Sequence, residues 1–409
     1  MTQNSSTADP RTAQTRVVVI GGGYAGTMAA NRLTQGRDVD VTLVNPRPQF
    51  VERIRLHQLV GGTHDAVHDL REVLAPDVRL VVDRATRIDV PRRTVALASG
   101  ARLAYDYLVY AVGSSGAPMD VPGAAEFAHP LATLEDAQRL RAALDAAPAG
   151  AAVTVVGGGP TGIETAAELA EAGRPVALVC GSVLGPYLRP EARLALAGRL
   201  GRLCVTVLDG PGARAAEVRP GVVRLEDGRD VPSSVTVWTA GFAVPDLAAE
   251  SGLATDDGGR LLTDETLASV DDPRIIAAGD AASPSGIPYR MSCQAAIPLG
   301  SLAADAVLAH VAGATPKAVS PGFVGQCLSL GRRAGLVQTA STDDHARKPF
   351  LTGRSAAAIK EVVCRSTYRG LLFEAKRPGT VNWALLTDGR RRHVLEAARQ
   401  EGLAPVLPA

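Results

Sequence analysis

Two glycine-rich hexapeptides, Gly21–Gly26 and Gly157–Gly162, carry the clearest chemistry in this 409-residue chain. Each follows an apolar run that predicts a strand and precedes a run with the composition of a helix. That context separates a phosphate-binding loop from a chance match. Free N–H groups at such a helix N terminus attract a pyrophosphate. Two such loops in one chain predict two dinucleotides, and the reaction that needs both is hydride transfer between them.

The glycines of both loops stand where a side chain would interfere with binding or packing. The first glycine allows a tight turn, the third lets a pyrophosphate approach the backbone, and the last lets the helix pack closely on the strand. We expect the neighbouring loop residues to contact the ligands as well. The predicted contacts are Gly21, Gly23, Tyr24, Ala25 and Gly26 in the first loop, and Gly157, Gly159, Pro160, Thr161 and Gly162 in the second.

The strand that follows each loop lacks the acidic residue that usually grips the adenosine ribose. The first of these strands ends in Asn45, whose amide can bind a hydroxyl without charge. The second ends in Cys180, and the loss of a carboxylate there makes a 2′-phosphate tolerable. Arg189 and Arg193 are candidates to hold that phosphate. The alternative is a site that discriminates little between NADH and NADPH.

Three further segments follow in a characteristic order. They are Tyr107–Gly113, Val235–Gly241 and Arg274–Ala281, and the last contains Gly279-Asp280. With the two loops, this ordered set resembles the flavoproteins with two dinucleotide-binding domains, which are pyridine nucleotide-disulfide oxidoreductase-like. Within them it is most similar to type II NADH:quinone oxidoreductases and apoptosis-inducing-factor-like proteins. The resemblance implies FAD at the first loop, with Asp280 on the ribityl chain, and NAD(P)H at the second. It also implies cofactor contacts at Ala111, Gly113, Gly241 and Gly279.

The same resemblance nominates two catalytic side chains. Glu164, just after the second loop, matches a glutamate that faces nicotinamide and flavin; the alternative is a carboxylate that only interacts with the helix dipole. Gln294 and the adjacent Ala295 match a helix that lies under the isoalloxazine and lines a quinone site. Pro298 and Leu299 replace the other two glutamines of that motif. For Gln294 alone, the alternative is an ordinary hydrogen bond at a helix start.

A charged segment follows the second strand of the first domain. Arg53 or Arg55 could hold the FAD pyrophosphate or an anionic flavin, and His57 could donate a proton at the acceptor site. The alternative is a solvated helix. His64 and His68 are spaced like neighbours on one helix face, but no recognisable pattern of further ligands follows. We therefore expect a solvated helix face there and no metal site.

These elements predict an α/β fold with two Rossmann-like dinucleotide-binding domains and a small C-terminal α+β module. A module of this kind supplies a dimer contact or covers the flavin in related reductases, so a homodimer is one expectation. The predicted divisions are a disordered N terminus at 1–14, a discontinuous FAD-binding domain at 15–122 and 241–312, an inserted NAD(P)-binding domain at 123–240, and a C-terminal module at 313–409 that begins with a β-hairpin.

Composition argues against several other classes of function. A net charge of +1 and an aromatic content of 4% offer little to nucleic acid, so we expect no such partner. Five cysteines without a C-x-x-C pair argue against a redox disulfide and suit a reducing cytoplasm. Neither a signal peptide nor a run of 18 apolar residues is visible. We expect a cytoplasmic protein whose membrane contact is at most weak and peripheral, at the inner face.

The leading hypothesis is an FAD-dependent NAD(P)H dehydrogenase that passes hydride from NAD(P)H to FAD and electrons to a small-molecule acceptor. A quinone is the first candidate for that acceptor. A second hypothesis keeps the enzyme class and makes the acceptor a ferredoxin-like protein, oxygen or a secondary metabolite. A third is a non-catalytic redox sensor whose NADH-reduced state changes its dimerisation.

Overall fold

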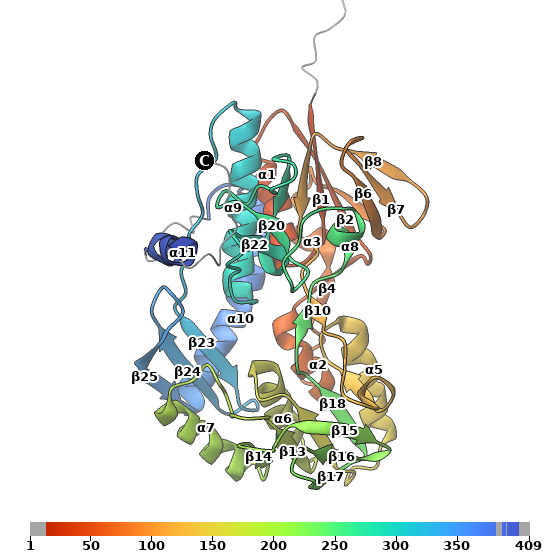
Figure 1. Ribbon diagram of the computed structural model, residues 1–409, viewed down its shortest axis with the longest axis vertical. Coiled ribbons are helices and arrows are strands. Elements are labelled where there is room, and N and C mark those ends of the chain that lie inside the picture. Colours follow the sequence, from red (N-terminus) through yellow and green to blue (C-terminus); the bar gives the residue numbers. More distant parts are fainter. Residues whose placement is uncertain (1–13, 382–386, 390, 401–409) are drawn as a thin grey trace, which may run out of the picture.

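The computed structural model describes residues 14–381, 387–389 and 391–400. The predicted disorder of the N terminus concerns residues that, apart from residue 14, lie outside these ranges. Figure 1 shows two α/β domains, one above the other, with a blue C-terminal module beside both. The predicted fold class is confirmed, because each domain is built on a parallel sheet with helices packed against it.

The first domain contains a five-stranded parallel sheet in the order β21-β9-β1-β2-β5. Alternate residues of β1 enter two different cores, so the sheet is buried on both faces, as parallel sheets require. The last strand in sequence, β21, returns from beyond the second domain to pair with β9. The strands are β1 (Thr15–Ile20), β2 (Val39–Asn45), β5 (Arg79–Val82), β9 (Tyr107–Tyr110) and β21 (Ile275–Ala277), and an antiparallel sheet of β6 (Ala85–Asp89), β7 (Thr94–Leu97) and β8 (Arg102–Ala104) flanks them.

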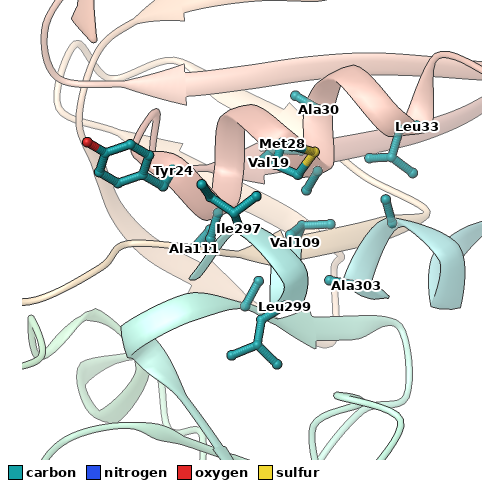
Figure 2. Packing of buried hydrophobic residues seen from close by; sticks show 14 of the residues in the cluster. Val19, Tyr24, Met28, Ala30, Leu33, Val109, Ala111, Ile297, Leu299 and Ala303 are labelled. Carbon is teal, nitrogen blue, oxygen red and sulfur yellow. The ribbon is translucent and has the colours of Figure 1, made fainter. Parts of the chain in front are cut away.

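Two helices, α1 (Tyr24–Leu33) and α9 (Cys293–Val311), cross closely on one face of this sheet. A Cβ placed on Gly300 would overlap the carbonyl oxygen of Ala25, so the crossing requires a glycine there. Figure 2 shows this region, with Met28 and Leu33 on α1 and Ile297 and Ala303 on α9 in one buried cluster. The crossing fixes the start of α9 beside the first glycine loop.

Among the described residues, α9 is also the one helix long and apolar enough to span a membrane by length and composition. This differs from the expectation that no such segment exists, because small residues such as Ala303 and Ala304 keep the mean hydropathy high between the large side chains. Most of the helix is buried against α1 and the sheet, as in the core helix of a globular domain.

The second domain repeats the design with a parallel sheet in the order β11-β18-β12-β13-β14. Its helix α6 begins at the second glycine loop, and α5 begins at Leu134, where the Thr133 side chain caps it. The strands are β11 (Ala128–Pro130), β12 (Val153–Val156), β13 (Val176–Val179), β14 (Thr206–Leu208) and β18 (Val235–Trp238); the helices are α5 (Leu134–Ala146), α6 (Pro160–Glu171) and α7 (Pro190–Arg202); a small sheet contains β15 (Ala215–Arg219), β16 (Gly221–Leu225) and β17 (Asp230–Ser233).

The C-terminal module begins with the predicted hairpin, β23 (Gly325–Ser329) and β24 (Gly335–Ala340). A third strand and a long helix, β25 (Ala346–Thr352) and α10 (Gly353–Lys376), complete it and were not predicted. α10 packs against α1 of the first domain as well as against β23 and β24. This helix therefore ties the module to the FAD domain.

Short elements connect these units. They are β3 (Gln49–Val51), η1 (Arg53–Arg55), α2 (Leu56–Gly61), β4 (Val67–Asp69), α3 (Leu70–Val73), β10 (Ser115–Gly116), α4 (Ala124–Phe127), β19 (Phe242–Ala243), α8 (Leu247–Glu250), β20 (Leu261–Thr263), η2 (Gly279–Ala281), β22 (Ala282–Pro284) and α11 (Arg391–Gln400).

The charged segment after β2 does not form the solvated helix that was one of its two interpretations. It folds as the single turn η1 followed by α2, and Arg55, His57 and Gln58 are buried. The expectation of a helix face carrying His64 and His68 is also wrong, because His68 lies in β4 and His64 in the loop before it. Charged partners from other elements explain both differences, as the site below shows.

Candidate functional site

The first glycine loop leaves room only where a ligand is expected. A Cβ on Gly21 would overlap the carbonyl oxygen of Ala111, and one on Gly26 would overlap that of Gly21. A Cβ on Gly23 would meet nothing within 4 Å, and this glycine is exposed. The loop therefore packs tightly on the sheet at two points and presents open backbone at the third. This cradle fits the pyrophosphate of FAD.

The second loop has the same geometry. A Cβ on Gly157 would overlap the hydroxyl of Thr239, and one on Gly162 would overlap the carbonyl oxygen of Gly157. Gly159 again faces open space within 4 Å. Pro160 and Thr161 form the half-buried first turn of α6, so the helix N terminus points at this space. The residues present fit a second pyrophosphate.

Three segments converge on the FAD side of the first loop. The hydroxyl of Ser114 donates to Asp280 Oδ2 at 2.7 Å, and Arg53 Nη1 donates to Ser114 Oγ at 2.9 Å. Arg53 also lies 3.7 Å from the Asp280 carboxylate. The backbone turns at Gly279 with a φ of +72°, which brings Asp280 to the ends of β9 and β21. Ser114 was not predicted, although it follows Gly113 directly.

Other predicted residues of the first site lie around this cluster. Asn45 accepts a hydrogen bond from the Gly22 N–H at 2.9 Å and donates to the Arg47 carbonyl at 2.7 Å, so its amide clamps the loop. Tyr24 is buried edge-on against Phe50, with ring centroids 5.2 Å apart, and burial raises the pKa of its hydroxyl. Ala25 and Ala111 are buried in the core. Gly113 faces open space, whereas a Cβ on the exposed Gly241, at the other crossing between domains, would lie 2.9 Å from Ala117 Cβ.

Glu164 lies in a buried cluster that unites all three units of the chain. Its carboxylate is 3.0 Å from Lys360 Nζ on α10 and accepts from the Ser329 N–H at 2.8 Å. His57 Nδ1 from α2 is 3.8 Å away. Burial by itself would raise the pKa of Glu164, but the Lys360 ammonium and the hydrogen bond from the Ser329 N–H hold it below its usual value. This carboxylate is thus ionised and paired, and does more than interact with a helix dipole.

His57 is a neutral member of this cluster. Its Nε2 lies 2.9 Å from the Ser329 hydroxyl, and its ring is buried. Burial, reinforced by the positive charges of Lys360 and Arg332, lowers its pKa to about 4 despite the attraction of Glu164. A neutral imidazole of this pKa holds no spare proton near pH 7. The proposed role of His57 as a ready proton donor therefore gains no support from this environment.

Arg55 is turned away from the cofactor space, which corrects the expectation that it holds FAD. Its Nη2 donates to Glu361 at 3.0 Å, its Nη1 donates to Gln58 at 2.9 Å, and its Nε donates to Glu52 at 3.3 Å. The hydrogen bond from Arg55 lowers the pKa of Glu361 to about 2. All donor groups of the guanidinium are therefore engaged within the protein.

His68 also has a partner in this charged cluster. Its Nε2 is 3.0 Å from Glu52, and its ring stacks on Tyr368 of α10 at 3.9 Å. No group of three potential ligands that could hold a metal ion occurs within the described ranges.

The start of α9 faces the C-terminal module. Gln294 accepts a hydrogen bond from the Val324 N–H at 3.0 Å, and the Ser292 hydroxyl caps the helix by accepting from Ala295 N at 3.3 Å. Pro298 and Leu299 are both buried, and Leu299 belongs to the core that α1 shares. Gln294 thus bonds the module expected to cover the flavin, whereas Ser292 makes the hydrogen bond at the helix start, and contact of Gln294 with the flavin stays a prediction.

Thiols near this junction are protonated. Burial raises the pKa of Cys293 to about 11 and that of Cys364 to about 12, and it raises the pKa of Cys327 as well. All five cysteines are free. Thiol-disulfide exchange requires a thiolate, so these side chains are poorly suited to relay electrons.

Comparison with known proteins gives one consistent result. The family described as pyridine nucleotide-disulphide oxidoreductase matches residues 15–300. An NADH dehydrogenase-like protein of Mycobacterium tuberculosis, Rv1812c, is 32% identical over 85% of this chain and 93% of its own length. The type II NADH:quinone oxidoreductase Ndh of the same organism is 27% identical over 78% of this chain and 77% of its own length.

Solved structures share the fold at lower sequence identity. NDH2 from Plasmodium falciparum in complex with NADH has a TM-score of 0.74 and 16% identity, covering 90% of this chain and 99% of that one. The sulfide:quinone oxidoreductase of Aquifex aeolicus has a TM-score of 0.73 and 19% identity, covering 94% of this chain and 95% of that one. These two likenesses concern the fold alone.

The two open glycines provide a matched pair of variants. Gly23→Val and Gly159→Val should both fold, because each glycine has a negative φ and its Cβ would meet no protein atom within 4 Å. We expect Gly23→Val to be purified without FAD. Gly159→Val should keep FAD but lose at least about tenfold in its rate of reduction by NAD(P)H, because a branched side chain fills the pyrophosphate space. Absorbance and anaerobic stopped-flow spectroscopy measure both. If NAD(P)H reduces Gly159→Val at the parent's rate, the second domain does not bind nicotinamide.

His57 should make stability depend on pH. Its folded-state pKa of about 4 lies below the unfolded value of 6.5, so between these values the unfolded chain binds the extra proton. Stability should therefore fall as pH drops through this window, by about 2 kcal/mol between pH 7 and pH 5. His57→Gln keeps a polar group beside Ser329 but does not titrate. The difference in thermal unfolding between parent and variant should shrink at pH 5. A difference independent of pH would contradict the assignment.

Proposed function

The chain belongs to the pyridine nucleotide-disulphide oxidoreductase family, and from that membership we propose that it is an NAD(P)H dehydrogenase whose electrons pass to a quinone. It is an oxidoreductase that uses FAD and NAD(P)H. FAD, when bound, supplies the chemistry that accepts a hydride from nicotinamide and gives up electrons to a second molecule. The chain's own residues bind the two dinucleotides through two cradles and shape the place where an acceptor can approach.

The observation that carries the quinone proposal is the junction of α9 with the C-terminal module. Gln294 offers an amide there and is tied to the module through Val324. The surrounding thiols are protonated, and none of them forms a disulfide. They are Cys293, Cys327 and Cys364. A site without a thiol relay suits a diffusible acceptor that reaches the flavin directly. The printed names of relatives that reduce quinones favour a quinone among such acceptors.

Ionised groups behind the junction would support the reduction of a quinone. Lys360 lies 3.0 Å from Glu164 and also donates to the carbonyl of Cys327 at 3.2 Å, so it connects the carboxylate to β23. A cationic group in this position would stabilise negative charge that develops on a bound acceptor. Because Glu164 raises the pKa of Lys360, the ammonium stays charged at neutral pH.

Separate measurement of the two half-reactions tests the acceptor site. Gln294→Leu removes the acceptor of the Val324 hydrogen bond, and we expect reoxidation of the reduced enzyme by a short-chain ubiquinone to slow about tenfold. Reduction by NAD(P)H should change by less than about twofold, since the nicotinamide cradle is untouched. Gln294→Glu retains a side-chain oxygen and should restore much of the rate. If Gln294→Leu slows both half-reactions equally, α9 does not form the acceptor site.

The same apparatus distinguishes the other acceptors. Reoxidation by oxygen or a ferredoxin, with none by ubiquinone, would replace the quinone proposal with the second hypothesis. A reduced state that no acceptor reoxidises would favour a redox sensor.

We further propose that the outer face of α10 contacts an anionic membrane, from which a quinone would reach the site. Val362 and Phe373 are exposed and lie eleven residues apart, about three helical turns, so they share one face. Exposed Arg354, Arg365 and Arg369 accompany them on the same helix. Apolar side chains flanked by arginines suit a helix that lies in the lipid headgroup region.

Vesicle binding tests this face. The parent should cosediment with vesicles rich in anionic phosphatidylglycerol, and less so with neutral phosphatidylcholine. A double variant, Val362→Asp with Phe373→Asp, should at least halve the bound fraction, because two apolar contacts are lost and two negative charges are gained. Leu194→Asp, on α7 of the second domain, is the control, since Leu194 is 75% exposed and lies on a different helix. Identical binding by all three proteins would contradict a membrane role for α10.

A further inference from the structure

The adenosine end of the second cradle has a distinctive electrostatic character. In a Rossmann domain the residue that ends the second strand meets the adenosine ribose, and a carboxylate there selects against a 2′-phosphate. Cys180 ends that strand here, and burial raises its pKa to about 12, so it carries no charge. The loop that follows folds over the glycines, with the Gly185 N–H donating to the Gly158 carbonyl at 2.9 Å. Groups beside this loop decide which dinucleotide fits.

The two arginines nominated from the sequence have other contacts. Arg193 Nη2 donates to the carbonyl of Leu188 at 3.0 Å, within its own helix start. Arg189 lies 3.7 Å from Glu191, and its backbone N–H donates to Gln338 of the C-terminal module. Both arginines thus contact the start of α7, although Nε of each is buried without a hydrogen-bond partner, and the arginine that lies against Gly181 is a different one.

Arg214 lies beside the loop instead. Its Cγ is 3.6 Å from the position that a Cβ would take on Gly181, the residue directly after Cys180. Gly181 has a φ of +68° and no side chain, so nothing at that position separates the arginine from the end of β13. The Arg214 backbone carbonyl accepts from the Glu226 N–H at 2.9 Å, which fixes the residue in place. Its side chain is exposed, and its guanidinium has no partner within the described ranges.

The neighbouring carboxylates do not neutralise this arginine. Asp227 is bound by Arg229 at 2.8 Å. Asp209, just after β14, is close enough to Cys180 to raise its pKa, and its negative charge would oppose a phosphate there. The site therefore contains an unpaired cation next to the strand end and an anion on the adjacent strand.

We propose that Arg214 holds the 2′-phosphate of NADPH, and that the chain accordingly prefers NADPH to NADH. An unpaired guanidinium can bind a phosphate through two parallel hydrogen bonds, which gives geometric specificity as well as charge. The neutral Cys180 removes the usual competitor for that position. This inference rests on nicotinamide binding by the second domain and is independent of the quinone.

Binding of adenosine fragments tests the proposal without any turnover. Calorimetry on the FAD-loaded protein should give a dissociation constant for 2′,5′-ADP at least about tenfold below that for 5′-AMP. Arg214→Ala should abolish this difference and leave 5′-AMP binding unchanged. Arg214→Lys should retain part of it, because charge remains without the fork. Arg202→Ala, another exposed arginine of the same domain, should behave like the parent.

A second variant removes a negative charge near the same phosphate position. Asp209→Asn should tighten 2′,5′-ADP further, because it removes the opposing charge, and the ratio of apparent KM values for NADH and NADPH in anaerobic reduction should follow the fragment affinities. A parent protein that binds both fragments equally, or an Arg214→Ala variant that weakens both equally, would overturn the proposal. Failure of quinone to reoxidise the enzyme would leave these measurements unaffected.

Discussion

The buried ion pair between Glu164 and Lys360 is the contact on which the site depends. It joins α6 of the second domain to α10 of the C-terminal module, and His57 brings α2 of the first domain to the same carboxylate. Two charges are removed from water here, which is tolerable only when the geometry is close and the remaining lone pairs are bonded. The Ser329 N–H and the Cys327 carbonyl meet that condition. Loss of either partner would leave an uncompensated charge, a cost of about 3–5 kcal/mol.

This constraint also explains the protonation of its surroundings. Buried groups near the pair adopt the form that adds no further charge, so His57 stays neutral and the thiols of Cys327 and Cys364 stay protonated. The ammonium of Lys360 lies between the Glu164 carboxylate and the Cys327 carbonyl of β23. The position of this ammonium is set by Glu164, 3.0 Å away. The Glu164 carboxylate pairs with Lys360, and its role at the nicotinamide stays a prediction.

Sequence patterns predicted the parts of the molecule that are determined by residues close together in the chain. The glycine loops were visible because Gly21 and Gly26 meet across five residues, and the return of the chain to the first sheet was visible because Gly279-Asp280 marks β21. The buried cluster was not predicted, because its partners are far apart in sequence. His57 and Ser329 are 272 positions apart, and Arg55 and Glu361 are 306 apart. A charged segment without visible partners resembles a solvated helix, and only the arrival of α10 converts it into a buried network.

The two cradles share one backbone geometry, so the loops themselves cannot tell FAD from NAD(P)H. In both, the side chain that ends the following strand packs on the second glycine. A Cβ on Gly22 would lie 2.9 Å from Asn45 Cγ, and one on Gly158 would lie 2.9 Å from Cys180 Cβ. Asn45 hydrogen-bonds the Gly22 N–H, whereas Cys180 has no amide to offer and leaves its loop open to neighbouring charges. Discrimination between FAD and NAD(P)H must therefore arise from the residues at the ends of the strands that follow the two loops. Contacts there are far from the reacting atoms and persist from ground state to transition state, so they set dinucleotide affinity and leave the hydride-transfer step unchanged.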